Sequence, residues 1–389
     1  MSPERAHGGA AVTAAGVVSP FGRGTGLLWS GLLAGRCCFA PVDGLLRQRL
    51  ALAAAVPESD LDAAVVAEDR AVALCVAAYE ELSARPAFAT VDRRRLGVCI
   101  GSTQGAIARW ERHQRLLDTD DKHRPPAPHG NHPLLEIVRR SGAGGPRANP
   151  SLACASGTAA LGIGLEWLRC GHCDAAIVGG VDALSRFVYE GFTALRALDA
   201  GAPRPFDADR AGLGLGEGAA LLLVQRDPAE AAVEVAGWGS AWDANHLTGP
   251  DPTGSGVARA VVAALRDAGV EPAEVDFVNA HGTGTVYNDL MESKGFARVF
   301  GDRLADLPVN SVKGAIGHSL AAAGAVEAVV CQQVVEHGLI PATVGLSRRD
   351  PRIPLDLVAR EARPAACRTV VSSSSGFGGI NVAVVLRHR

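Results

Sequence analysis

The chain has 389 residues, of which 48% are hydrophobic and 20% are charged. This length and composition can bury a large core, so a disordered protein is excluded, and one large domain or two closely packed domains are expected. The net charge of -3 and the lack of a basic stretch argue against nucleic-acid binding, and no uninterrupted apolar run is long enough to span a membrane.

The nine cysteines are an odd number and lack the spacing of a metal site. Cys170 and Cys173 form a CxxC-like pair, but no second pair completes a site. The N-terminus has no charged segment followed by an apolar core, so no secretory signal is expected. We therefore expect no metal and a location in the reducing cytoplasm.

Predicted strands and helices alternate along the first part of the chain. In order they are an apolar segment at 10–18, a helical pattern at 68–84, a strand-like run at 96–100 ending in Gly-Ser-Thr, a helix at 155–168, and apolar runs at 175–178 and 219–224. A polar stretch at about 104–145 is expected to form a surface excursion. Continuous rather than alternating apolar runs predict strands covered on both faces, which is typical of α/β proteins.

The second part of the chain repeats this order. Its elements are an apolar segment at 233–238, a helical pattern at 257–268, a strand-like run at 275–280 ending in a small-residue loop, a helix at 320–335, and apolar runs at 369–372 and 382–386. The repetition predicts two similar α/β units, residues 1–228 and 229–389, related by an approximate twofold axis. Cys154 and His318 then occupy corresponding places, each at the start of a helix.

Cys154 is the candidate nucleophile. It stands among small residues, in Leu-Ala-Cys-Ala-Ser-Gly-Thr, directly before an uninterrupted helical pattern. The positive end of a helix dipole favours a thiolate, so we expect a lowered pKa and a reactive sulfur here. The alternative is an inert cysteine in the core.

Two histidines are candidate partners for this thiol. His281 ends an apolar strand and precedes Gly-Thr-Gly-Thr, whereas His318 follows a glycine and opens a predicted helix. A helix N-terminus disfavours imidazolium, so we expect a neutral His318 that donates a hydrogen bond to a developing negative charge. Lys313 lies in apolar surroundings and needs a partner if it is buried; Glu327 is the candidate.

A second loop of small residues is predicted at 372–381, between two strands. It is either an ordinary hairpin connection or a mobile gate. The gate is suggested by one bulky residue, Phe377, between glycines that can absorb a backbone change.

Together these segments resemble the β-ketoacyl synthases of the thiolase superfamily, of the elongating type that condenses an acyl thioester with a malonyl thioester. The resemblance runs nearly the whole chain. Its motifs, in the family's order, are 16–22; 153–157; 204–207 with 216–218; 243–248 with 250–252; 281–285 with Asn288, Asp289 and Glu292; 313–318 with Gly324 and Glu327; and 376–379 with Asn381. The resemblance implies the thiolase fold, in which two pseudo-twofold related α/β halves form αβαβα layers.

The resemblance also implies the chemistry. Cys154 would accept the acyl chain from the phosphopantetheine of an acyl carrier protein. His281 and His318 would hold the malonyl thioester carbonyl and stabilise the enolate formed on loss of CO2. The backbone N–H groups of Cys154 and Phe377 would form the oxyanion hole. No bound cofactor is implied, because the substrates arrive on the carrier.

Supporting roles are implied for further residues. They are Lys313 and Glu327, which would order the site; Thr283 and Thr285, which would contact the pantetheine arm; Phe377 with Gly378, at the malonyl gate; Phe192 and Gln104, at the acyl pocket; and Arg196, Arg47 and Arg49, which would meet the carrier protein. A dimer is implied too, either of two copies or with a related subunit.

Some positions depart from the family pattern. The stretch between Gly105 and Cys154 looks shorter than in relatives, Gln104 stands where an apolar residue is usual, and Leu213 replaces a common aromatic residue. Short synthases of this kind resemble those of polyene or type II polyketide pathways. The acyl chain, the pathway and the pairing stay open.

Other functions fit these residues less well. A thiolase would need a second cysteine base at the C-terminal glycine loop, where Phe377 stands and from which Cys367 is separated by a strand. A chalcone-type or initiating enzyme would have asparagine in place of His318. A cysteine hydrolase would need water as acceptor, for which no loop gives a reason. A catalytically silent chain-length subunit and an ordinary fatty acid elongation synthase remain as alternatives.

Overall fold

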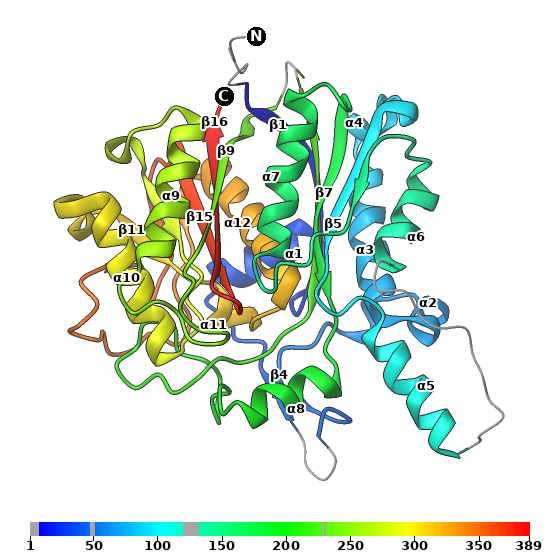
Figure 1. Ribbon diagram of the computed structural model, residues 1–389, viewed down its shortest axis with the longest axis horizontal. Helices are drawn as coiled ribbons and strands as arrows, with labels where there is room; N and C mark the ends of the chain where they lie inside the picture. Colours follow the sequence, from blue (N-terminus) through cyan, green and yellow to red (C-terminus); the bar gives the residue numbers. More distant parts are fainter. Residues whose placement is uncertain (1–7, 47–50, 120–131, 227, 229–230) are drawn as a thin grey trace.

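The computed structural model describes residues 8–46, 51–119, 132–226, 228 and 231–389 (Figure 1). The strands of the first half are β1 (Ala10–Ser19), β2 (Gly22–Arg23), β3 (Ala40–Val42), β4 (Ala51–Ala53), β5 (Leu96–Gly101), β6 (Arg147–Ala148), β7 (Ala175–Asp182) and β8 (Gly218–Gln225). Its helices are α1 (Thr25–Leu33), η1 (Glu58–Asp60), α2 (Ala63–Glu68), α3 (Arg70–Ser83), α4 (Pro86–Ala89), η2 (Arg93–Arg95), α5 (Ile107–Thr119), α6 (His132–Ser141), α7 (Ser156–Arg169) and α8 (Arg186–Ala194), where η marks a 3-10 helix.

The second half begins at Val233 with a long strand, β9. Its strands are β9 (Val233–Trp242), β10 (Phe277–Asn279), β11 (Pro308–Asn310), β12 (Leu339–Ile340), β13 (Asp356–Leu357), β14 (Arg363–Pro364), β15 (Thr369–Gly376) and β16 (Ile380–His388). Its helices are α9 (Ser255–Ala268), η3 (Pro272–Glu274), α10 (Val286–Phe300), η4 (Gly301–Ala305), α11 (Lys313–Ile316), η5 (Leu320–Ala322) and α12 (Ala323–His337).

The strand order shows the duplication directly. The first half runs β1-β8-β7-β5-β6 and the second runs β9-β16-β15-β10-β11, with β13 at the outer edge. In both halves the first two pairings are antiparallel and the next two are parallel. Antiparallel pairing of β1 with β9 joins the halves. The predicted pseudo-twofold α/β arrangement is therefore confirmed, whereas the domain limits at 228 and 229 stay a proposal.

Helices cover the sheet on both sides and also lie between its two halves. In Figure 1, α7 and α12 occupy the centre, α3 lies outside the first half and α9 lies outside the second. This is the expected αβαβα layering. Every residue of β7 is buried, as the uninterrupted apolar run predicts for a strand with helices on both faces.

The two halves approach closely where α7 and η5 begin. A side chain at Gly157, in the first turn of α7, or at Gly180 in β7 would collide with the carbonyl oxygen of Ala321 in η5. Only glycine lets these backbones approach so closely. This contact brings the segment that carries Cys154 beside the segment that carries His318.

Two predicted segments differ in detail from the structure. Residues 372–381 are mainly strand, and only a three-residue turn at 377–379 joins β15 to β16. The excursion at 104–145 contains α5 and α6, and the part at 120–131 lies outside the described residues. None of the described helices is both long and apolar enough to cross a membrane. The described residues also contain no cluster of three or more His, Cys, Asp or Glu suited to a metal ion.

Candidate active site

Cys154 lies in a tight turn that precedes α7. Ala153 has the left-handed φ of +47°, which is unusual for a residue with a side chain. The Ser156 hydroxyl holds the turn, because it accepts the Leu152 N–H at 2.8 Å and donates to the Ala153 carbonyl at 2.6 Å. The turn places the buried Cys154 side chain at the junction of the two halves.

The expected lowering of the Cys154 pKa was wrong. Burial raises the pKa of this thiol to about 12, and the opposing effect of the Lys313 charge is smaller. The sulfur packs in an apolar cluster that includes Leu213 and Leu320, and such surroundings disfavour a thiolate. Before substrate binds, Cys154 is therefore a protonated thiol.

His281 and His318 are buried against each other. Their ring centroids lie 5.0 Å apart, and the ring planes are nearly perpendicular. Burial, and secondly the charge of Lys313, lowers the pKa of both imidazoles well below the usual value. His318 is thus neutral, as expected, although the cause is burial rather than a helix terminus: η5 begins two residues later. Each neutral ring keeps one N–H donor.

Lys313 connects His281 to a buried acid. Its ammonium donates to the His281 carbonyl at 2.6 Å and lies 3.4 Å from His281 Nδ1. It also donates to the Glu327 carboxylate, the expected partner. Burial raises the pKa of Glu327 to about 6, against the opposing effect of Lys313.

Two acids of α10 hold the loop that follows His281. Glu292 accepts the backbone N–H groups of His281 and Gly282, each at 2.7 Å. Asp289 accepts those of Gly284 at 3.2 Å and Phe206 at 2.7 Å. Burial raises the pKa of Glu292 to about 7 and that of Asp289 to about 6. In the sequence, both acids belong to the motif that begins at His281. The one further signal of a joint role is their spacing of three residues, which places both on one face of a helix.

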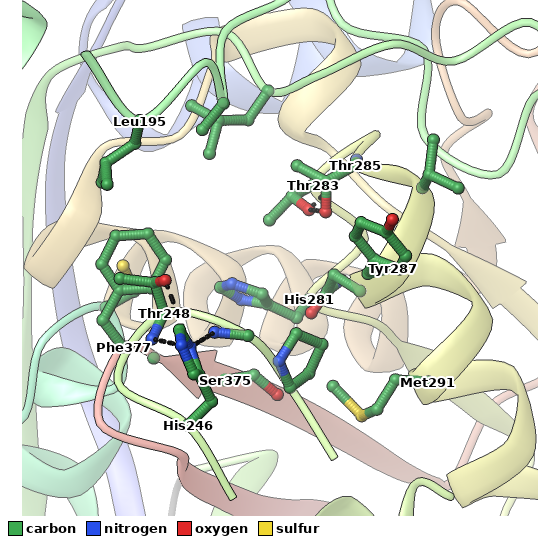
Figure 2. A pocket seen from close by; sticks show the side chains of 18 of the residues that line it. Leu195, His246, Thr248, His281, Thr283, Thr285, Tyr287, Met291, Ser375 and Phe377 are labelled. Carbon is green, nitrogen blue, oxygen red and sulfur yellow. Dashed lines mark hydrogen bonds between the residues drawn. The ribbon is translucent and has the colours of Figure 1, made fainter. Parts of the chain in front are cut away.

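A cavity of about 410 Å³ opens onto these groups. Its wall contains Cys154, His281, His318, Thr283, Thr285, Phe192, Arg196 and Phe377, so the structure brings these predicted site residues together. Figure 2 shows the Thr283 and Thr285 side chains on the same side of the cavity, with their hydroxyl groups 3.0 Å apart. Lys313 and Glu327 are not among the wall residues and act on the site through His281.

The turn at 377–379 packs against the nucleophile. The Phe377 ring stacks on Phe192, with centroids 5.5 Å apart. Gly378 and Gly379 have φ values of +84° and +76°, which glycine adopts without strain. A side chain at Gly376 would lie 3.2 Å from the backbone nitrogen of Cys154, so the turn is held close to that N–H group.

Some predicted site residues lie elsewhere. Gln104 is not part of the cavity wall; its side-chain amide donates to the Ala183 carbonyl at 3.2 Å and accepts from the Ser185 hydroxyl at 2.7 Å. These two contacts satisfy the polar side chain, and its role at the acyl pocket stays a prediction. Gly378 belongs to the turn but not to the wall. Arg47 and Arg49 lie outside the described residues.

Sequence reasoning assigned no role to the loop at 243–250, although it forms a wall of the cavity. His246 Nδ1 accepts the backbone N–H groups of Thr248 and Gly249, each at 3.1 Å (Figure 2). The Leu247 carbonyl accepts the Gly378 N–H at 2.7 Å, which ties this loop to the Phe377 turn. The family motif at 243–248 was the available signal.

The sequence of this chain is similar to the sequences of known proteins. Residues 10–229 match the family model described as beta-ketoacyl synthase, N-terminal domain, and residues 232–347 match its C-terminal domain. The chain is 34% identical over 415 aligned positions to a tetracenomycin polyketide synthase ketoacyl synthase alpha subunit of Streptomyces glaucescens, covering 96% of each chain. It is 36% identical to 3-oxoacyl-[acyl-carrier-protein] synthase 2 of Staphylococcus aureus, covering 77% of this chain and 78% of the relative.

A solved structure of a related protein is similar to this chain over nearly its whole length. The structure titled the ishigamide ketosynthase/chain length factor superposes with a TM-score of 0.90 at 32% identity, covering 98% of this chain and 99% of the other.

Proposed function

Because the chain belongs to the β-ketoacyl synthase family, we propose that Cys154, His281 and His318 perform its acyl transfer and Claisen condensation. The observation that carries this assignment is the convergence of one thiol and two neutral imidazoles on a single cavity. That combination supplies a nucleophile and two uncharged hydrogen-bond donors.

The first step loads the acyl group. Cys154 Sγ attacks the carbonyl carbon of the acyl thioester, a new C–S bond forms, and the old one breaks. The departing phosphopantetheine sulfur takes the proton that the Cys154 thiol loses. The exchange is balanced, because one thioester and one thiol give one thioester and one thiol.

The second step creates the carbon nucleophile. The malonyl group loses CO2, and the electron pair of the broken C–C bond forms an enolate. The N–H groups of His281 and His318 donate to its oxygen. Burial makes such hydrogen bonds stronger than they are in water.

The third step forms the product. The enolate carbon attacks the acyl-Cys154 carbonyl, and the tetrahedral oxyanion is held by the backbone N–H groups of Cys154 and Phe377, at about 3 kcal/mol for each donor. The C–S bond then breaks, and the Cys154 sulfur takes up a proton from solvent. The net products are a β-ketoacyl thioester, CO2 and a free carrier thiol.

Residues along the cavity are assigned supporting roles. Thr283 and Thr285 place two hydroxyl groups on the path to Cys154, where they would donate to the pantetheine arm. Phe377 is assigned as the gate on the malonyl side and Phe192 as part of the acyl pocket; the two rings stack on each other, so opening the gate would separate them. Lys313 and Glu327 position His281.

We assign an acyl carrier protein as the partner that delivers both substrates, and we retain Arg196 as a contact. The Staphylococcus relative is named for acyl-carrier-protein substrates, and the ishigamide structure pairs a ketosynthase with a chain length factor. Both support a carrier-dependent enzyme that forms a dimer with itself or with a related subunit. All nine cysteines are unpaired, which is consistent with a reducing cytoplasm.

A chain-length subunit is the second candidate, because the ishigamide structure contains such a subunit. The cavity favours the catalyst: a silent subunit has no use for a thiol, two neutral imidazoles and a buried Lys313–Glu327 pair at one place. Fatty acid elongation and a polyketide or polyene pathway are both supported by the relatives.

The test is to mix the purified protein with acyl- and malonyl-loaded carrier protein and to measure the intact masses of both. We expect an acyl adduct that is absent in Cys154→Ala and a β-ketoacyl product on the carrier. No adduct with any acyl carrier would overturn the catalytic assignment and favour the silent subunit. An adduct without product would show that a partner subunit or another carrier is needed.

A further inference from the structure

A buried carboxylate joins the two halves beside the cavity. Asp182 ends β7, is 1% exposed and does not belong to the cavity wall. It accepts hydrogen bonds from five uncharged donors, which are the hydroxyl groups of Ser102 and Thr103 and the backbone N–H groups of Thr103, Gln104 and Ala321. Burial raises the pKa of Asp182, whereas these hydrogen bonds lower it. A proton on either oxygen would face a donor, so we assign the ionised form.

Four of the five donors come from the first half and one comes from the second. Ser102, Thr103 and Gln104 follow β5, which pairs with β7. Ala321 belongs to η5, and its N–H group donates to Asp182 at 2.9 Å. The carboxylate is thus fixed by its own half and holds one backbone group of the other half.

That backbone group belongs to a strained turn beside His318. Leu320 has the left-handed φ of +53°, which is unusual for a residue with a bulky side chain. Strain of this kind persists only where surrounding contacts hold the backbone in place. The Ala321 N–H follows Leu320 directly, so its bond to Asp182 is one of the contacts that hold this turn.

The His318 ring is held differently from the His281 ring. His281 has the Lys313 ammonium 3.4 Å from its Nδ1 atom. His318 Nδ1 is buried and has no hydrogen-bond partner in the part of the chain that the structure describes. The position of the His318 ring therefore depends on its backbone, which donates to the Gly214 carbonyl at 2.8 Å on one side and leads into the turn held by Asp182 on the other.

We propose that Asp182 is a positioning residue for His318, because it holds the turn that fixes where this imidazole meets the malonyl thioester. The inference rests on the proposed function, in which His318 donates to the enolate oxygen. A misplacement of about 1 Å can slow an enzymatic step by about 100-fold. Acyl loading of Cys154 uses neither histidine in the proposed first step, so it depends less on this turn.

Asp182→Asn tests the two steps separately. The variant keeps the size of the side chain but replaces an acceptor oxygen by an amide group that faces other donors. We expect decarboxylation of malonyl-loaded carrier protein to slow by at least about tenfold, whereas acyl loading of Cys154 changes by less than about threefold. The intact masses of carrier and enzyme over time measure the two rates. Equal slowing of both steps, or of neither, would overturn the proposal.

A His318→Ala background separates positioning from a general loss of structure. Residues that act through one group have non-additive effects. In this background Asp182→Asn should slow decarboxylation further by less than about twofold. The same loss in both backgrounds would show that the effect of Asp182 does not pass through His318, and the proposal would fall.

Thr103→Val tests the same contact with a smaller change, should Asp182→Asn fail to fold. It removes one hydroxyl donor to Asp182 and keeps the branched shape of the side chain. We expect decarboxylation alone to slow, by about threefold, and a wild-type rate would contradict the proposal.

The matched control is Asp69→Asn at the start of α3. Asp69 is also a buried carboxylate, and it accepts the backbone N–H groups of Ala71 at 2.9 Å and Val72 at 3.2 Å, but it does not belong to the cavity wall. Both rates should stay at the wild-type value. A wild-type protein that neither becomes acylated nor releases CO2 would overturn the proposed function itself.

Discussion

At the scale of single residues, the site is governed by desolvation. Cys154, His281 and His318 are all buried, and burial moves each pKa toward the neutral form of the side chain. Lys313 supplies the positive charge nearby, paired with Glu327. An uncharged thiol beside uncharged imidazoles suits a reaction whose negative charge develops only after substrate binds.

Alkylation of Cys154 should therefore depend steeply on pH. Only the thiolate reacts, and with a pKa of about 12 the thiolate fraction rises tenfold for each pH unit well below that value. We expect the rate with iodoacetamide to rise about tenfold per unit between pH 7 and 9, measured by peptide mass spectrometry. Exposed Cys37 and Cys170 provide comparison peptides. A rate for Cys154 that is constant over this range would show that the thiol is already ionised.

At the scale of elements, short connections determine where the chemical groups point. The end of β15 lies close to the Cys154 backbone, and Glu292 of α10 accepts the backbone N–H group of His281. Both of these contacts involve backbone groups. The side-chain pattern of either element alone therefore does not predict the contacts.

Gly376→Ala tests the first connection. The added carbon would lie 3.2 Å from the Cys154 nitrogen and 3.1 Å from Ala153 Cβ, so the turn must shift by a few tenths of an ångström. Displacing one oxyanion donor should slow formation of the β-ketoacyl product by about 100-fold, measured by intact mass of the carrier over time. The control is Gly191→Ala in α8, where the new carbon would have no neighbour within 4 Å. A wild-type rate of β-ketoacyl formation in Gly376→Ala would contradict the assigned oxyanion hole.

Glu292→Gln tests the second connection. Burial raises the pKa of Glu292 from 4.5 to about 7, so the folded protein keeps a proton here that the unfolded chain loses above pH 4.5. The stabilisation from this group is complete below pH 4.5 and is lost as the pH rises to about 7. Between pH 5 and 8, the wild type should lose on the order of 2 kcal/mol more unfolding free energy than the variant.

Urea unfolding at several pH values measures this difference. Exposed Glu361→Gln is the control, and its curve should follow that of the wild type. Parallel curves for wild type and Glu292→Gln would contradict the raised pKa.

At the scale of the whole molecule, catalysis requires that the two halves meet. Cys154 comes from the first half and His281 and His318 from the second, and the contact between the start of α7 and η5 helps to bring them to one cavity. The same duplicated topology that builds the sheet thus places the thiol opposite its hydrogen-bond donors.

Gly157→Val tests this junction. Its side chain would collide with the Ala321 carbonyl and crowd Ala325, so it should cost about 1–3 kcal/mol of unfolding free energy and reduce acylation of Cys154. Urea unfolding and intact mass measure the two effects. Gly26→Val in α1, where a new carbon would meet nothing within 4 Å, is the control. Full activity with unchanged stability would show that the halves do not depend on this contact.

Much of this protein is determined by the sequence itself. The repeated order of apolar strands and helices predicts the duplicated α/β fold, because strands buried on both faces need continuous apolar runs. The small residues around Cys154, the two histidines and the isolated Lys313 with Glu327 mark the site, since reactive or charged groups within apolar segments need a function or a partner.

The tertiary structure alone decided the rest. The direction of the Cys154 pKa depends on side chains such as Leu213 and Leu320, which are far away in sequence but bury the sulfur. The hydrogen-bond partners of Gln104, Ala183 and Ser185, lie about 80 residues further along the chain. Desolvation and shared surfaces are properties of the packed chain, and local sequence does not encode them separately.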